Sequence, residues 1–170
     1  MKPLILDERS PDPAAPTTTV GLGELVAAAA PGCLVTYGLG SCVGLCVYDP
    51  LRRVGGLAHI FLPWGDTDRE GQPALYANKG VERLVRAVAE LGGDLRRLQA
   101  KMVGGARLFA HSDTLNIGER NVGAVRAELQ RLMIPLAGEE VGGNRGRSVL
   151  FDLSSGRLRI TSGGREIRWL

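Results

Sequence analysis

A cysteine, a histidine and a threonine between Leu34 and Pro63 have the side chains needed for thiol chemistry. Cys42 follows a glycine-rich turn, and His59, one of only two histidines in the chain, lies in a later apolar segment. A catalytic cysteine needs an accessible sulfur, a lowered pKa and a base within hydrogen-bonding reach. Backbone N–H groups that such a turn frees, here those of Ser41 and Cys42, can stabilise an oxyanion. The stretch therefore favours a thiol enzyme with Cys42 as nucleophile and His59 as base.

Three short strands are expected to position these side chains. Leu34–Tyr37 predicts a buried strand before the turn, and it carries the threonine. After the turn, the alternation of apolar residues over Val43–Val47 predicts a second strand. Gly55–Leu62 predicts a third strand, with the histidine on one of its two faces. A meander of these strands would bring all three side chains to one edge of a sheet.

Non-catalytic roles for this stretch are a buried core, a zinc site and a dinucleotide-binding loop. Cys33 and Cys46 are predicted to be small buried hydrophobic residues, and the pattern alone also allows His59 to be a hydrogen-bonded core residue. A zinc site formed by Cys42, Cys46 and His59 is disfavoured, because the chain has no C-x-x-C pair and few histidines. A dinucleotide-binding loop at Gly38–Gly44 is disfavoured, because its last glycine spacing is wrong and a strand follows it.

The composition is that of an ordinary globular protein. The 170 residues are 44% hydrophobic and 23% charged, which is unlike a disordered chain. A scattered net charge of +3 and an aromatic content of 5% do not indicate a nucleic-acid partner. No apolar run approaches the roughly 18 residues of a membrane span, and the N-terminus does not fit a signal peptide. Three cysteines without framework spacing suit a reducing compartment, so we expect a cytoplasmic protein without membrane insertion.

The remaining periodicity predicts an α+β protein. Residues 1–19 are expected to form a flexible leader and residues 20–170 a single domain, in which Ala27–Ala30 is extended. Apolar stripes predict helices at about Tyr76–Leu91 and Ile117–Leu132, the second opened by a capping box of Asn116 and Glu119. Further strands are predicted at Leu98–Val103, Pro135–Val141, Arg147–Leu153, Arg157–Ile160 and Glu166–Trp169. Strands in hairpin-like succession outnumber helices, which favours layers over a regular βαβ fold.

Several segments resemble the CheD family, the chemoreceptor glutamine deamidases of bacterial chemotaxis. The resemblance extends over roughly Val20–Ile167 and is densest at Thr36–Val43, similar to the family's nucleophile segment. The other similar segments, in the family's order, are Gly55–His59 with Leu62-Pro63, Lys101–Ala106, Asn116–Asn121 and Gly142–Ser148. The leader and the sequence around His111, which we expect at the surface, have no counterpart, and Tyr37 replaces an expected aliphatic residue.

The resemblance implies a fold, a site and a reaction. The fold would be a layered α/β/β sandwich with mixed sheets and two main helices, similar to the catalytic domain of cytotoxic necrotizing factor toxins. Thr36, Cys42 and His59 would form the catalytic set, with Thr36 orienting the imidazole. The reaction would convert receptor glutamines to glutamates for later methylation, with no metal or cofactor. The partners would be the cytoplasmic helices of chemoreceptors and, in some systems, a CheC-type phosphatase.

Asn144 and Arg145, in a glycine-rich loop, are candidates for holding the substrate, and a solvated turn explains them equally well.

Two other functions remain open. One is a regulatory module that docks a CheC-type phosphatase or a receptor helix, with catalysis secondary. The other is a different thiol enzyme, such as a transglutaminase or a peptidase. Amine incorporation would identify the transglutaminase, and backbone cleavage the peptidase.

Overall fold

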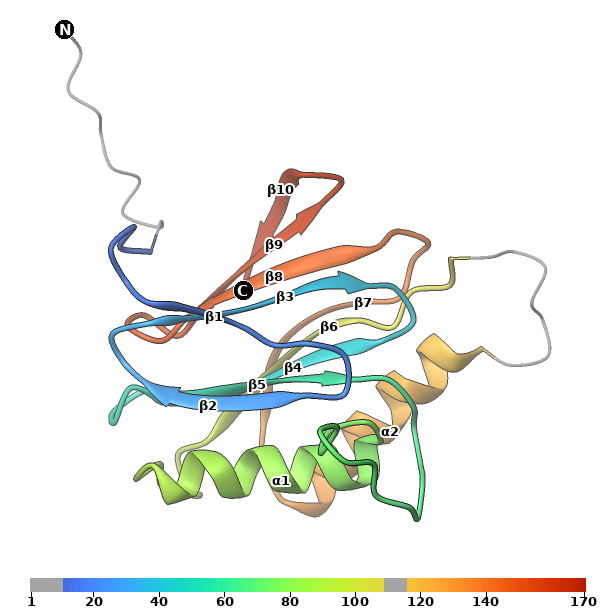
Figure 1. Cartoon of the computed structure of the whole chain (residues 1–170), viewed down its shortest axis with the longest axis horizontal. Coiled ribbons are helices and arrows are strands. Elements are labelled where there is room, and N and C mark those ends of the chain that lie inside the picture. Colours follow the sequence, from blue (N-terminus) through green and yellow to red (C-terminus); the bar gives the residue numbers. More distant parts are fainter. Residues whose placement is uncertain (1–10, 109–115) are drawn as a thin grey trace, which may run out of the picture.

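The computed structural model describes residues 11–108 and 116–170, and these form three stacked layers (Figure 1). Two helices cover one face of a five-stranded central sheet, and a five-stranded outer sheet covers the other face. The predicted α+β fold with layered α/β/β architecture is therefore confirmed. Residues 1–10 of the predicted leader and His111 lie outside the described residues.

Each sheet mixes parallel and antiparallel pairs. The central sheet has the order β2 (Leu25–Ala29), β5 (Val54–Ile60), β4 (Val43–Asp49), β6 (Gln99–Gly104) and β7 (Leu136–Val141). The outer sheet has the order β1 (Thr17–Thr19), β3 (Cys33–Leu39), β8 (Arg147–Asp152), β9 (Arg157–Ser162) and β10 (Arg165–Trp169). The parallel pairs are β6 with β7 and β1 with β3. The chain between β6 and β7 thus makes one βαβ crossover, which the predicted hairpin-like succession did not include.

Strand β1 is the main local difference from the sequence prediction. Thr17–Thr19 were assigned to the leader, yet they pair in parallel with Cys33, Leu34 and Val35 of β3. The pairing continues into Val20, whose N–H donates to the carbonyl of Val35 at 2.8 Å. Three exposed threonines contain no alternation of apolar and polar residues, so no local pattern distinguishes this strand from a loop.

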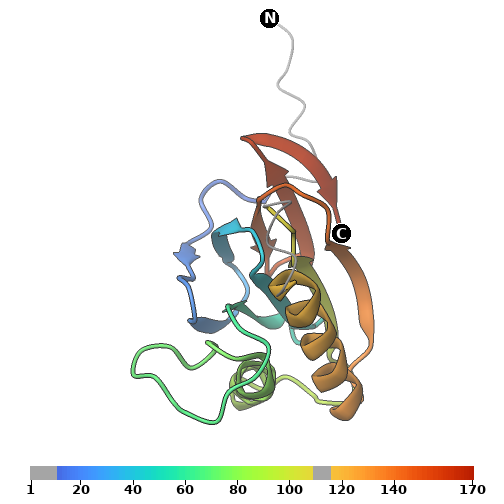
Figure 2. The same ribbon diagram turned by 90° about the vertical axis from the view of Figure 1, so that its right-hand side faces the viewer.

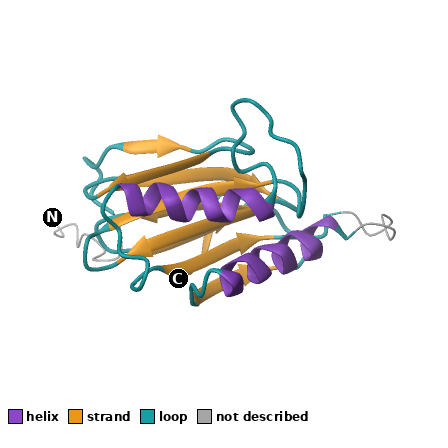
Figure 3. Cartoon of the chain, turned by 90° about the horizontal axis from the view of Figure 1, so that it is seen from below, coloured by secondary structure: helices purple, strands orange, loops and turns teal. Residues whose placement is uncertain are grey.

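The two helices begin and end close to the predicted residues. Helix α1 (Ala77–Glu90) packs a stripe that includes Val81, Leu84 and Val88 on the central sheet, and Gly92 follows it with φ of 97°. Helix α2 (Ile117–Arg131) is capped by Asn116, whose Oδ1 accepts from the Glu119 N–H at 3.3 Å. Both helices lie on the same face of the central sheet (Figure 3). Neither is long and apolar enough to span a membrane.

The alternation along β4 divides the molecule into two cores. Val43, Leu45 and Val47 pack under the helices, whereas Cys46 and Tyr48 face the outer sheet. The layer between the two sheets also contains the apolar residues Leu34, Leu39, Leu57 and Phe151. The predicted catalytic residues belong to this layer between the sheets, at one end of the strands.

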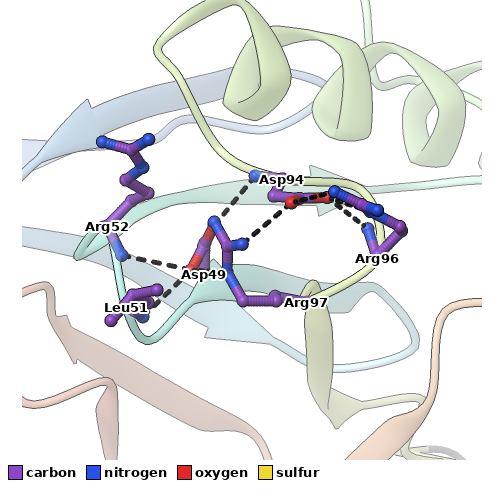
Figure 4. A network of polar contacts seen from close by, with 6 residues as sticks. All are labelled: Asp49, Leu51, Arg52, Asp94, Arg96 and Arg97. Atoms are coloured by element: carbon purple, nitrogen blue, oxygen red, sulfur yellow. Dashed lines mark hydrogen bonds and ion pairs between the residues drawn. The ribbon is translucent and has the colours of Figure 1, made fainter.

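At the opposite end of β4, Asp49 ties two loops together (Figure 4). Its carboxylate accepts from the backbone N–H groups of Leu51 and Arg52 in the β4–β5 turn and of Asp94 after α1, at 2.8–3.1 Å. The Arg97 guanidinium adds an ion pair at 2.9 Å. Burial alone would raise the pKa of Asp49, but these bonds, led by that of Arg97, hold the pKa well below its ordinary value of 3.8.

Candidate active site

Thr36 and His59 meet across the layer between the sheets. Thr36 lies on β3 of the outer sheet and His59 on β5 of the central sheet, and their side chains are 0% and 5% exposed. Thr36 Oγ1 lies 2.8 Å from His59 Nδ1 and 2.7 Å from the carbonyl oxygen of Val20. A carbonyl only accepts, so the single hydroxyl proton goes to Val20. Oγ1 must then accept from Nδ1–H, and the neutral imidazole keeps its lone pair on Nε2.

Gly44 provides the space for this contact. It lies directly opposite His59 in the β4–β5 ladder. A Cβ at Gly44 would lie 2.9 Å from Leu39 Cδ1 and 3.6 Å from Thr36 Cγ2. Because cross-strand neighbours project to the same face of a sheet, any side chain here would occupy the space beside the imidazole. The glycine therefore serves the Thr36–His59 contact rather than the turn.

Cys42 lies next to this pair without bonding to it. It immediately precedes β4, packs in the layer between the sheets and is 8% exposed. Two residues later Gly44 pairs with His59, so Cys42 lies beside the end of the histidine strand. His59 Nε2 is buried, and no group among the described residues forms a hydrogen bond with it. The structure thus joins Thr36 to His59 and places Cys42 directly before the neighbouring strand β4. In unliganded sites, hydrogen bonds of this kind are often long or unformed.

Burial keeps both reactive groups neutral in the resting site. It raises the pKa of the Cys42 thiol above its ordinary value of 9.0, and the residue's own backbone N–H opposes this only in part. Burial lowers the pKa of His59 below its ordinary value of 6.5. The lowered thiol pKa that the sequence argument required is therefore not found. Near pH 7 the pair is a thiol beside a neutral imidazole.

The glycine-rich turn is held by its carbonyls. The backbone carbonyls of Gly40, Ser41 and Cys42 all accept hydrogen bonds, at 2.7–2.9 Å. Their donors are the backbone N–H groups of Ala106 and Gly105 and the side chain of Asn121. Across residues 11–108 and 116–170, no carbonyl and no other residue's side chain accepts from the N–H of Ser41 or Cys42. Two N–H groups next to the thiol are thus open to an incoming oxygen.

Asn144 and Arg145 are exposed residues of the β7–β8 turn. This turn and the β3–β4 turn that contains Cys42 lie at the same end of the molecule, the end that faces the viewer in Figure 2. Backbone bonds connect this turn to the strand that pairs with β4, because the Gly142 N–H donates to the carbonyl of Gly104 at 2.9 Å. Among the described residues, no hydrogen bond or ion pair joins either side chain to Thr36, Cys42 or His59. A cleft of about 380 Å³ lies beside the turn. It is lined by Gly142 and Gly143 of the turn, by Gly105 after β6, and by polar residues at the start and in the middle of α2.

Asn121 is a site residue that the sequence analysis did not single out. It lies on α2 and is fully buried, and its Nδ2 donates to the carbonyls of Ser41 and Phe61, both at 2.9 Å. The signal was present in the sequence: Asn121 shares the core-facing side of α2 with Gly118, Val122 and Val125. A polar residue in such a stripe needs buried partners, and here these are two carbonyls of the site.

The comparisons with a family model and with curated proteins agree on one family. The family model described as "CheD chemotactic sensory transduction" matches residues 61–162. A "Probable chemoreceptor glutamine deamidase CheD" of Desulfitobacterium hafniense (strain DSM 10664 / DCB-2) is 45% identical over 145 residues, which cover 84% of this chain and 91% of the relative. The chain belongs to the CheD family. The resemblance seen in its motifs is thereby confirmed.

Two further relatives of the CheD family match as broadly. A "Probable chemoreceptor glutamine deamidase CheD" of Moorella thermoacetica is 46% identical over 155 residues, covering 88% of this chain and 92% of the relative. A "Chemoreceptor glutamine deamidase CheD" of Thermotoga maritima is 43% identical over 152 residues, which cover 87% of this chain and 94% of the relative. A solved Bacillus licheniformis protein, "hypothetical protein YfiH", overlaps 68% of this chain and 49% of its own, with a TM-score of 0.42 and 16% identity. That similarity is too low to relate the two folds.

Proposed function

We propose that this chain is a protein-glutamine deamidase that hydrolyses glutamine side chains on the cytoplasmic helices of chemoreceptors. Cys42 is the nucleophile, His59 the general base and acid, and Thr36 the residue that orients the imidazole. The proposal rests chiefly on the hydrogen bond from His59 Nδ1 to Thr36, because it leaves on Nε2 a lone pair that no described group uses and that can serve as the base. The names of the curated relatives support the choice of substrate.

In the first half of the reaction the thiol forms a thioester. Because both groups start neutral, His59 Nε2 takes the thiol proton as Cys42 Sγ attacks the carboxamide carbon of the glutamine. The new C–S bond forms while the carbonyl electron pair moves to the oxygen, and the N–H groups of Ser41 and Cys42 stabilise that oxyanion. The imidazolium then donates its proton to the amide nitrogen, the C–N bond breaks and ammonia leaves.

In the second half water releases the product. His59 Nε2 removes a proton from water, the hydroxide attacks the thioester carbon, and the same N–H groups hold the second oxyanion. The C–S bond breaks, the imidazolium returns its proton to the Cys42 sulfur, and the substrate leaves as glutamate. Groups of the chain, the substrate and water balance every step, so the mechanism needs no metal or cofactor.

Substrate binding is proposed for the loops at the end of the molecule where Cys42 lies. Asn144 and Arg145 are exposed in a turn that is bonded to the end of β6, next to the Cys42 turn. A guanidinium and an amide there can bind the backbone and acidic flanking residues of a receptor helix. The alternative function is a regulatory module that docks a CheC-type phosphatase or a receptor helix, with catalysis secondary.

Mass spectrometry of the cognate receptor's cytoplasmic helices tests this function. The helices are incubated with the wild-type protein, with Cys42→Ala and with Cys33→Ala, a matched control at another buried cysteine. The wild type and the control should convert particular glutamines to glutamates and release equal amounts of ammonia, whereas Cys42→Ala should do neither. Persistent ammonia release by Cys42→Ala would remove Cys42 from the mechanism. Amine incorporation, backbone cleavage or binding without modification would indicate the transglutaminase, the peptidase or the binding module.

A further inference from the structure

Asn121 connects the two halves of the catalytic site through a single nitrogen. Its Nδ2 donates to the carbonyl of Ser41, the residue before the nucleophile, and to that of Phe61, the second residue after His59. We infer that Asn121 is a positioning residue that fixes the direction of the Cys42 N–H, the group that would stabilise the oxyanion. The inference deepens the proposed function and rests on it.

The geometry of the peptide bond carries the effect from Asn121 to Cys42. In a planar trans peptide, the C=O of one residue and the N–H of the next point in opposite directions. Because Asn121 holds the Ser41 carbonyl toward α2, the Cys42 N–H must point away from α2. That is the side of the thiol, since Cys42 packs in the layer between the two sheets, whereas α2 packs on the opposite face of the central sheet. Without the bond, the peptide between Ser41 and Cys42 could rotate and turn the N–H away.

The second bond fixes the turn relative to the histidine strand. Since one nitrogen lies 2.9 Å from both carbonyl oxygens, the Ser41 peptide and the end of the His59 segment are held at a constant spacing. Both N–H groups of the amide are thereby used.

The amide oxygen of Asn121, which forms no hydrogen bond with any described group, argues against a role in stability alone. Asn121 Oδ1 is buried, and no donor within the described residues reaches it. A buried acceptor without a partner is unfavourable for folding, and the neighbouring helix positions that face the core, Val122 and Val125, are apolar. An asparagine here is explained by its two donor bonds.

The test compares Asn121→Leu with Asn78→Leu. Leucine has nearly the shape of asparagine and removes both donors. Asn78, on α1, is the matched control, because its amide also bonds a loop backbone, that of Gly65, at 3.0 and 3.1 Å. Turnover of receptor glutamines is measured for both variants, and the spectrum of the full chain labelled with [¹⁵N]cysteine is recorded. The chain has three cysteines, so each spectrum reports the N–H groups of Cys33, Cys42 and Cys46 separately.

Asn121→Leu should lower kcat about 10²-fold, as removal of an oxyanion donor does, with KM changed less than about twofold. Its Cys42 N–H signal should move while those of Cys33 and Cys46 stay, and Asn78→Leu should change neither kcat nor these signals. Loss of all three signals in Asn121→Leu would mean that this variant does not fold. The same measurements are then made on Asn121→Ala, whose side chain is smaller and adds no bulk. An unchanged kcat with a lowered melting temperature, or an unmoved Cys42 signal, overturns the inference. If the wild type deamidates nothing, the proposed function fails, and the spectra still decide whether Asn121 positions the N–H.

Discussion

The hydrogen bond between Thr36 and His59 joins the two sheets of the sandwich at the candidate active site. Its 2.8 Å length connects β3 of the outer sheet with β5 of the central sheet, and the Val20 carbonyl determines its direction. The packing of one sheet on the other therefore determines which imidazole nitrogen carries the proton. This coupling makes the tautomer of His59 a property of the fold rather than of the local strand.

Thr36→Val should reduce deamidation while leaving the fold in place. Valine has nearly the same shape but no hydroxyl, so His59 Nδ1–H loses its acceptor and the imidazole loses its fixed tautomer. We expect kcat/KM to fall by about 10²-fold, less than for a charged orienting group. Thr36→Ser keeps the hydroxyl and should retain most of the activity. The measurement is ammonia release from receptor helices, below the melting temperature of each variant.

A Thr36→Val protein with kcat/KM within twofold of the wild type would remove Thr36 from the catalytic set. Because the Val20 carbonyl also loses its partner, the variant should be less stable by about 1–3 kcal/mol. A loss of stability alone therefore does not support the orienting role.

Local patterns were sufficient for the elements around the site. The strand over Val43–Val47 has a clear alternation, helix α1 has an apolar stripe, and Asn116 with Glu119 marks the start of α2. Each of these signals is contained in one segment, so the sequence predicts the element and the side on which it packs.

Features that depend on two distant segments were not predictable in this way. Strand β1 exists because it pairs with β3, and the contact of Thr36 with His59 exists because two sheets stack. The thiol pKa of Cys42 is raised by burial, a consequence of the same stacking. Asn121 bonds carbonyls far from it in the sequence, so its place in an apolar stripe was the local signal for it.

Alkylation of Cys42 should show that the resting thiol is protonated. Burial raises its pKa above 9.0, so the thiolate that reacts with iodoacetamide is scarce at pH 7. We expect the alkylation rate, followed at Cys42 by peptide mass spectrometry, to rise with pH through a midpoint above 9.0. A preformed thiolate–imidazolium pair would react fully near neutral pH, with a midpoint below about 7. That result would contradict the neutral resting pair.

Gly44→Ala should disturb the site through sterics alone. Its Cβ would lie 2.9 Å from Cδ1 of the fully buried Leu39 and press toward Thr36. We expect a loss of about 1–3 kcal/mol in the free energy of unfolding and a fall in kcat, both measured against Gly123→Ala. Gly123 is an exposed position of α2 where a Cβ meets nothing within 4 Å. That control should gain about 0.5–1 kcal/mol from helix propensity and keep full activity. Equal stability of the two variants would show that Gly44 has no steric role.

Asp49→Asn should weaken the fold without affecting the chemistry. The carboxylate is 0% exposed and accepts three backbone bonds as well as the Arg97 ion pair, but Arg97 is 34% exposed and therefore partly screened by solvent (Figure 4). We accordingly expect a loss of about 2–3 kcal/mol at pH 7. Since Asp49 lies at the end of β4 remote from Cys42, kcat at temperatures well below melting should stay unchanged.

The pH dependence of this loss separates the charge of Asp49 from its shape. The folded-state pKa of Asp49 lies below the unfolded value, so its stabilising contribution is complete above about pH 4 and is lost as the pH falls toward the folded-state pKa. Denaturation curves of wild type and Asp49→Asn should therefore differ most near pH 7 and converge as the pH falls below about 4. A difference of the same size at pH 3 and pH 7 would show that the ionised carboxylate is not what ties the two loops together. In that case the loss would come from the substituted amide itself, and the charge of Asp49 with its Arg97 ion pair would contribute nothing measurable.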